Sequence, residues 1–205
     1  MLKNICYAVL LGVGMAACLS QNSNEDTTET GQVPAQITDV TDPEAVHAPS
    51  PENFVIQENK VGTVAIGMPI DSVRNNVVSG FAIADTTLQL EGQAYTAYNL
   101  HVEGDAKGML IEQQCDKGCK VWRINVKSPD YKTGKGIGVG SKYSEIQQLY
   151  PIETVVLADG GLVAVSDNTG MSFVLDTSQI PANERGRLTP ATVPANTLVK
   201  SILVY

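Results

Sequence analysis

The feature that most constrains the fold is a short pattern that occurs twice, at an offset of 73 residues. Residues 64–73 read Val-Ala-Ile-Gly-Met-Pro-Ile-Asp-Ser-Val, and residues 137–146 read Ile-Gly-Val-Gly-Ser-Lys-Tyr-Ser-Glu-Ile. Both copies indicate a short strand, a glycine turn and the start of a helix, because apolar residues then recur at helical spacing. Pro69 suits the first helical position of the first copy, and Ser141 is a natural N-cap for the second.

Each predicted helix is followed by runs of residues that are typical of strands, separated by glycine-containing turns. These runs cover residues 81–90, 95–102, 109–114, 120–126, 152–157, 162–165, 171–175 and 199–205. One helix followed by several strands, twice, predicts an α+β fold that is mostly β. A helix-plus-antiparallel-strands module would be duplicated, with repeats at about 61–128 and 134–205. The alternative is a chance similarity between two helix starts.

The first residues have the pattern of an export signal. Lys3 supplies a positive charge, and residues 5–15 form an apolar run that is shorter than the roughly 20 residues needed to span a bilayer. The run ends at Met15-Ala16-Ala17-Cys18, which resembles the lipobox of bacterial lipoproteins. This predicts a signal peptide at residues 1–17 and acylation of Cys18, with palmitate among the chains, so that lipid anchors the protein to a membrane. A conventional cleavage after Ala-x-Ala is the alternative.

Two further features bear on location. No Asp follows Cys18, and this favours the outer membrane over the inner one, with the protein facing the periplasm. Residues 18–53 are then predicted to be a disordered acidic tether, because they contain seven acids, four prolines, no Lys or Arg and no aromatic residue. We interpret the tether as a spacer that leads to a domain at residues 54–205. A docking strip for a basic partner is the alternative.

The charge balance limits the classes of partner. The formal net charge of the chain is −8, which argues against a protein that binds nucleic acid by neutralising phosphates. Most of the excess acids belong to the predicted tether, so the domain itself is close to neutral. The acidic balance therefore says little about the charge of a protein partner.

Cys115 and Cys119 are expected to form a structural disulfide. They enclose Asp-Lys-Gly between two strand-like runs, and facing cysteines across a short hairpin lie near disulfide distance. A pair of cysteines in an exported protein is also typical of a disulfide. The alternatives are a metal pair and a redox dithiol. A metal would need more ligands than His101 supplies, and redox dithiols usually have two intervening residues. We predict no metal and no cofactor.

Several short motifs together resemble a known family. They are Val-Gly-x-Val/Ile near residue 61, Glu91-Gly92-Gln93-Ala94-Tyr95, Arg123-Ile124-x-Val126-x-Ser128-Pro129 and Gly-x-Gly-Ser141-x-Tyr143-Ser144-x-Ile. Their order resembles a family of small, uncharacterised enterobacterial envelope lipoproteins, one member of which is described as sigma-E-regulated. The resemblance covers roughly residues 54–150. It implies an envelope lipoprotein, and it implies no functional residue because the family has no assigned activity. Looser similarities extend to a small module of outer-membrane assembly lipoproteins and to duplicated modules that inhibit β-lactamases.

The sequence offers little catalytic chemistry. His101 lies in a strand-like run, and neither His-Glu-x-x-His nor Gly-x-Ser-x-Gly occurs. Residues 134–142 are rich in glycine, but the order Gly-Ser-Lys departs from a phosphate-binding loop, and a strand-turn-helix connection explains the glycines. An anion held by a helix N-terminus near Lys135 and Lys142 remains open. We expect a protein that is not an enzyme.

Residues 177–197 form a long predicted irregular stretch between two strand-like runs, and such loops are often functional. Arg185 and Arg187 lie in it and are two of only four arginines in the chain. The loop is either a partner-binding segment or a plain surface excursion.

Two functions follow as hypotheses. The first is a non-catalytic binding or assembly accessory that meets an envelope protein through a sheet face or through the 177–197 loop. The second is an inhibitor or sequestering protein for an envelope enzyme, which predicts a rigid concave face with exposed aromatic side chains. Candidates for that face are Tyr95, Tyr98 and Tyr131, and buried tyrosines would count against this hypothesis.

Overall fold

A computed structural model describes residues 49–158 and 161–205. The predicted signal peptide, Cys18 and almost all of the predicted tether lie outside the described residues, so these features stay predictions. At the start of the described part, η1 (Pro51–Phe54) is a short 3-10 helix that overlaps the end of the predicted tether. The ring of Phe54 lies 5.7 Å from that of Phe81 and 5.2 Å from that of Tyr131, which ties η1 to the domain.

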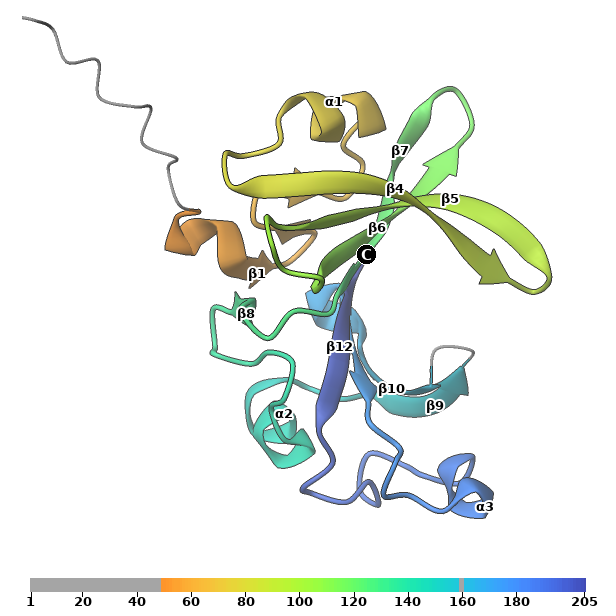
Figure 1. Ribbon diagram of the computed structural model, residues 1–205. Coiled ribbons are helices and arrows are strands. Elements are labelled where there is room, and N and C mark those ends of the chain that lie inside the picture. The colour runs from red at the N-terminus through yellow and green to blue at the C-terminus, as the bar shows by residue number, and fades with distance from the viewer. Residues whose placement is uncertain (1–48, 159–160) are drawn as a thin grey trace, which may run out of the picture. The chain divides into compact units, whose positions relative to one another are not determined.

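The protein is mostly β, and its main element is an antiparallel sheet of eight strands (Figure 1). The strands are β4 (Phe81–Leu90), β5 (Gln93–Val102), β6 (Gly108–Cys115), β7 (Cys119–Val126), β9 (Thr154–Ala158), β10 (Gly161–Ser166), β11 (Met171–Leu175) and β12 (Val199–Val204). Their order across the sheet is β4-β5-β6-β7-β12-β11-β10-β9. Each half of the chain thus contributes four consecutive strands, and the two sets meet where β7 pairs with β12.

A smaller sheet and the short helices complete the described fold. Its order is β3 (Val64–Ala65), β2 (Lys60–Val61), β1 (Val55–Gln57) and β8 (Lys132–Thr133), with β1 and β8 parallel. The helices are α1 (Ile70–Asn75), α2 (Tyr143–Leu149) and α3 (Ala182–Arg185), with a 3-10 turn η2 (Asp167–Thr169). One helix therefore precedes each set of four strands.

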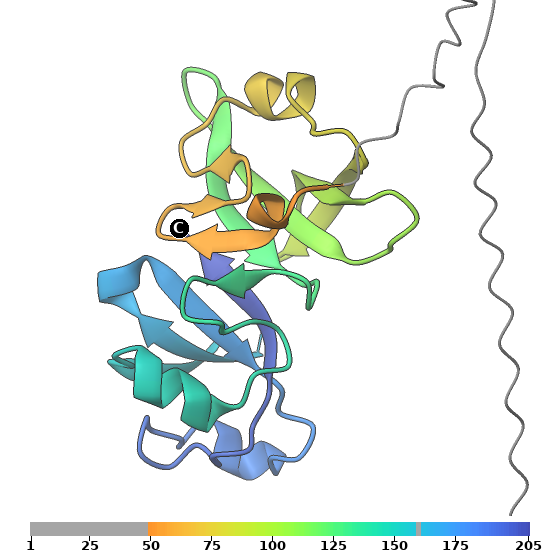
Figure 2. The ribbon, with the colours of Figure 1, turned by 90° about the vertical axis from the view of Figure 1, so that its left-hand side faces the viewer.

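The core lies on one face of the large sheet. Figures 1 and 2 show α1, α2 and the small sheet on the same side of it. Val73 of α1 and Ile146 of α2 are buried in one cluster with inward side chains of the strands, such as Ile111, Phe173 and Ile202. Because side chains of a strand alternate between faces, burying this set leaves the intervening side chains on the opposite face of the sheet.

The predicted strands agree with the structure, since 81–90 and 171–175 coincide with β4 and β11 and the other six runs differ by at most two residues at either end. Both main helices begin one residue later than predicted. Pro69 is the N-cap of α1, and Lys142 replaces Ser141 as the N-cap of α2. The Ser141 hydroxyl instead accepts a hydrogen bond of 3.1 Å from the backbone N–H of Gly138, while Glu145 accepts one of 2.7 Å from that of Lys142.

The two copies of the sequence pattern do not form identical pairings. In the first copy Val64–Ala65 pairs with β2 as a strand, whereas residues of the second copy make two isolated bridges, Lys132 with Gly138 and Lys142 with Leu198. The helix and the four strands that follow are common to both halves, but the short strand before the helix is not. This difference leaves the duplication as a hypothesis.

Candidate functional site

The face of the large sheet opposite α1 and α2 is hollowed into a groove of about 900 Å³, which we call the concave groove. In Figure 1 the β4–β5 hairpin and the β9–β10 pair both curve toward its side, on the right of the view. Two irregularities contribute to this curvature: the β6–β7 register shifts at Glu112/Gln113, and the β11–β12 register shifts at Val174/Leu175. Such bulges bend a strand and increase its local twist.

Part of the lining of the concave groove is apolar. It includes side chains from five strands: Leu88, Leu90, Leu110, Val163, Val174 and Leu203. Leu110, Val163 and Val174 are buried although they lie on the face opposite α1 and α2. A contiguous apolar surface in a hollow is typical of an interaction site.

Two aromatic side chains stand at the groove with nearly half of their surface accessible. Tyr95 is 45% exposed and Trp122 is 47% exposed. The guanidinium carbon of Arg123 lies 4.7 Å from the centre of the Trp122 ring, within the range of a cation–π contact. Half-exposed aromatic residues beside an arginine are the residue types that most often dominate the energy of protein interfaces.

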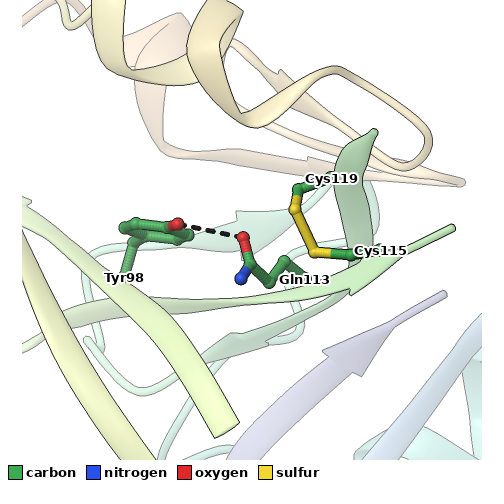
Figure 3. The surroundings of a disulfide bond; sticks show 4 residues. All are labelled: Tyr98, Gln113, Cys115 and Cys119. Atoms are coloured by element: carbon green, nitrogen blue, oxygen red, sulfur yellow. Dashed lines mark hydrogen bonds between the residues drawn. A yellow bond between two sulfur atoms is a disulfide. The ribbon is translucent and has the colours of Figure 1, made fainter. Parts of the chain in front are cut away.

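The other two predicted aromatic residues do not belong to the groove. Tyr98 is buried on the core face, and its hydroxyl donates a hydrogen bond of 2.9 Å to Gln113 Oε1 (Figure 3). It lies three residues from Tyr95, and an odd spacing along a strand reverses the face. Tyr131 is buried against Phe54. These two positions were wrong as candidates for an exposed aromatic face, and by the criterion stated above they count against the inhibitor hypothesis.

Trp122 was missed because the bulge changes the phase of β7. Strict alternation would put Trp122 on the same face as Ile124 and Val126, which are buried in the core. The register instead pairs Arg123 with Glu112 and Val121 with Gln113, leaving Trp122 as the additional residue of the bulge. The sequence signal for the bulge was the pair of adjacent apolar residues Val121 and Trp122, because two neighbouring residues of a regular strand cannot both face the core.

The floor of the groove, on the central strands β6, β7 and β12, carries polar side chains beside Leu110 and Leu203. Arg123 donates two hydrogen bonds to the carboxylate of Glu112, of 3.0 Å from Nε and 2.7 Å from one terminal nitrogen. Glu112 is only 5% exposed and the Arg123 side chain is 27% exposed, so the carboxylate of this ion pair is buried and its cation is half-buried. Asn125 lies two residues further along β7, and its Oδ1 is buried with no hydrogen-bond partner among the described residues. Ser201 of β12 also lines the groove and is buried.

The disulfide between Cys115 and Cys119 is present and closes the hairpin between β6 and β7, with a Cα–Cα distance of 4.1 Å (Figure 3). Both cysteines are exposed. The bond therefore fixes the end of the two strands that carry Glu112, Trp122 and Arg123. Within the part of the chain that the structure describes, no three His, Cys, Asp or Glu side chains gather in a way that would hold a metal ion.

The 177–197 loop was predicted to be irregular, but it contains the short helix α3. The guanidinium of Arg185 donates hydrogen bonds of 2.9 Å to the backbone oxygens of Ile180 and Thr177, so it closes its own loop. Arg187 is exposed. The backbone oxygen of Pro190 accepts bonds of 3.0 Å from Tyr143 Oη and 2.7 Å from Gln147 Nε2, which fasten the loop to α2. Neither arginine is among the described residues that line the concave groove.

The glycine-rich segment 134–142 does not bring Lys135 and Lys142 together at a helix N-terminus, as the anion-site hypothesis would need. Lys135 Nζ donates a hydrogen bond of 2.6 Å to the backbone oxygen of Leu149 and lies 4.6 Å from the centre of the Tyr150 ring. Lys135 thus lies at the C-terminal end of α2, whereas Lys142 is the N-cap at the other end. His101 remains on β5, half-buried, with Nδ1 3.0 Å from the backbone oxygen of Val102.

None of the helices in residues 49–158 and 161–205 is both long enough and apolar enough to cross a membrane. Comparison with protein families finds no matching family, and comparison with curated proteins finds no match. Among solved structures, the chain is similar to that of the uncharacterised protein yfeY of Escherichia coli. The identity is 17% and the TM-score 0.53, and the match covers 74% of this chain and 98% of that one. At this identity the similarity establishes a shared fold.

Proposed function

We propose that the protein is a non-catalytic binding or assembly accessory of the bacterial envelope that holds a partner protein in its concave groove. The observation that carries this proposal is the groove itself, with its apolar side chains, its ion pair and its exposed Tyr95 and Trp122. The likeness to yfeY contributes the fold alone, because that protein is itself uncharacterised.

The location is part of the same proposal. The lipobox-like residues 15–18 support a lipoprotein in which acylated Cys18 anchors the chain, and the motifs between residues 61 and 146 support the small enterobacterial, sigma-E-regulated type. The absence of Asp after Cys18 supports the outer membrane, and the tether then lets the domain face the periplasm. An anchored domain would search for partners close to the membrane, which raises their effective concentration.

We also propose that the two halves descend from one duplicated helix-plus-strands module. Support comes from the sheet order, in which α1 precedes β4–β7 and α2 precedes β9–β12, with β7 and β12 at the seam. Closing two such sets into one sheet produces a single continuous face. The concave groove would then be a consequence of the duplication, since residues of both halves line it.

A second candidate function is inhibition or sequestration of an envelope enzyme. The specific observation in its favour is the pair of half-exposed aromatic residues, Tyr95 and Trp122, in a concave face. The burial of Tyr98 and Tyr131 counts against it. The two functions differ in the partner: an inhibitor would reduce the activity of a purified partner enzyme, whereas an accessory would leave it unchanged.

The proposed function is tested by in-cell photo-crosslinking of the full, membrane-anchored chain. A photoreactive amino acid is placed at Trp122 or at Leu88 in the groove, and at Leu149 as the matched control. Leu149 is a 39% exposed apolar side chain on α2, on the opposite side of the sheet. We expect a discrete protein adduct from both groove positions and none from Leu149. Equal adducts from all three positions, or none from the groove, would overturn the proposal.

A further inference from the structure

We infer that the occupant of the concave groove is a neutral, extended polypeptide segment, recognised through Asn125 and Arg123. This inference rests on the proposed function and names the chemistry of the partner at the same site. Four properties of the groove carry it: the charge of its lining, the hydrogen-bonding groups of its floor, their spacing and its size.

The charges of the lining cancel. Glu91 and Glu112 contribute two negative charges, and Arg123 and Lys127 contribute two positive ones. Glu112 and Arg123 already neutralise each other through two hydrogen bonds. A groove with no net charge has no electrostatic preference for a phosphate, a nucleic acid or a strongly acidic peptide, and a neutral occupant complements it.

The floor requires an occupant that both donates and accepts hydrogen bonds. Asn125 is half-buried in the lining, and its Oδ1 is an acceptor without a partner among the described residues; a rotation of the amide would bring it to an N–H in the groove. The Arg123 guanidinium has five N–H donors and spends two of them on Glu112. A peptide group carries one N–H and one C=O and satisfies both needs. An acyl chain satisfies neither and would leave these groups buried without partners, which is costly.

The spacing on β7 fits an extended chain. Arg123 and Asn125 lie two residues apart on the same face of the strand, a separation of roughly 7 Å. Equivalent peptide groups of an extended segment repeat at the same interval, so a segment that runs along β7 meets both residues. Its alternate side chains would then contact the apolar side chains on either side of Asn125, Leu110 on β6 and Leu203 on β12.

The size of the groove is that of a site for several residues. Its volume of about 900 Å³ lies near the upper end of the range for binding pockets, roughly 300–1,000 Å³. It therefore accommodates a short segment of chain better than one side chain, with Tyr95 and Trp122 available to cover the segment.

The test uses the full chain and a display library of random 12-residue peptides as the probe. Asn125→Leu is the diagnostic variant, because it keeps the size of the side chain and removes the acceptor. Ser166→Ala is the matched control, since the Ser166 hydroxyl is also buried without a partner among the described residues but belongs to the core side of β10. We expect enriched peptides of near-zero net charge that bind Asn125→Leu at least tenfold more weakly and Ser166→Ala unchanged.

Thermal melting of both variants separates binding from folding. Each substitution removes a buried polar atom without a partner, so we expect neither melting temperature to fall. If Asn125→Leu does not fold, Asn125→Ala replaces it, because it also removes the acceptor, and binding at least tenfold weaker is expected. Enriched peptides that bind wild type and Asn125→Leu equally, strongly charged enriched peptides, or no enrichment at all would overturn the inference.

Two other probes distinguish failure of this inference from failure of the proposed function. They are phospholipid vesicles and soluble oligosaccharides of N-acetylglucosamine. Binding of either one through the groove, with no peptide enriched, would overturn the polypeptide inference. Discrete protein adducts from Trp122 and Leu88 in cells, with no peptide enriched, would overturn only the short-segment inference and leave the proposed function standing.

Discussion

Tyr131 is a buried side chain whose hydroxyl has no hydrogen-bond partner among the described residues. Because a buried hydroxyl without a partner costs about 1–3 kcal/mol, we expect Tyr131→Phe to raise the free energy of unfolding at pH 7, by about 1 kcal/mol. Chemical denaturation of both proteins measures this difference. A destabilised phenylalanine variant would mean that the hydroxyl has a partner.

The same residue predicts a dependence of stability on alkaline pH. Burial, with a smaller contribution from the charge of Asp130, raises the pKa of Tyr131 to about 12 from its ordinary value near 10. The unfolded chain then loses the proton before the folded one, so stability decreases as pH rises from about 10 to 12. We expect this part of the decrease to disappear in Tyr131→Phe, and parallel curves for the two proteins would contradict it.

The ion pair on the floor of the groove gives a second prediction at this scale. Arg123→Met leaves the carboxylate of Glu112 buried without its cation, and we expect a loss of about 3 kcal/mol in the free energy of unfolding. Arg74→Met is the matched control, because the Arg74–Asp85 pair is 44% and 61% exposed and such pairs contribute less than about 1 kcal/mol. Equal losses in the two variants would show that the carboxylate of Glu112 is not buried in solution.

At the scale of elements, the hairpin of β6 and β7 depends on its disulfide. In the chain-entropy view, a bond that closes so short a loop contributes about 2 kcal/mol, by restricting the unfolded chain. We expect the variant with serine at both Cys115 and Cys119 to lose about that amount and to keep the sheet, as judged by circular dichroism. A reducing agent should destabilise the wild type and leave the variant unchanged. A reductant effect on both proteins would contradict this account.

The strands that sequence patterns predicted best are those with clear local limits. The runs at 81–90 and 171–175 coincide with β4 and β11, and a glycine, Gly80 or Gly170, stands directly before each of them. β11 is buried at all five positions, so its run of apolar residues and not alternation made it recognisable. The small sheet was only partly predicted, since β1 gains its partner β8 from a distant part of the chain. Trp122 was missed for a related reason, because a bulge depends on how two strands pair, and the adjacent apolar residues Val121 and Trp122 do not by themselves specify one.

The candidate site follows the same division. The sequence predicted a sheet face or the 177–197 loop as the interacting surface, and it included Tyr95 among the aromatic candidates. The sequence pattern could not establish that this face is concave, because curvature arises from the pairing of eight strands and from two bulges. Arg185 illustrates the converse: its charge suggested a partner, but its guanidinium bonds to the backbone of its own loop.

At the scale of the whole molecule, we propose a lipid anchor at Cys18, which lies outside the described residues. We expect the wild-type chain to fractionate with membranes and to incorporate labelled palmitate. Cys18→Ser should do neither, because a serine hydroxyl does not become the acylated N-terminal cysteine. Membrane fractionation of the serine variant without acylation would refute the anchor, and it would leave the concave groove untouched as a hypothesis.

The central claim is that the concave groove is the binding surface, and Trp122 reports on it directly because it is the single tryptophan of the chain. Nearly half of this side chain is exposed in the free protein, so an occupant that covers it removes water from the indole. The measurement is the tryptophan emission spectrum of the full chain during titration with the enriched peptide that binds most tightly. The peptide itself contains no tryptophan. We expect a shift to shorter wavelength that saturates with binding and is lost in Asn125→Leu. Formation of the complex with an unchanged emission spectrum would contradict it.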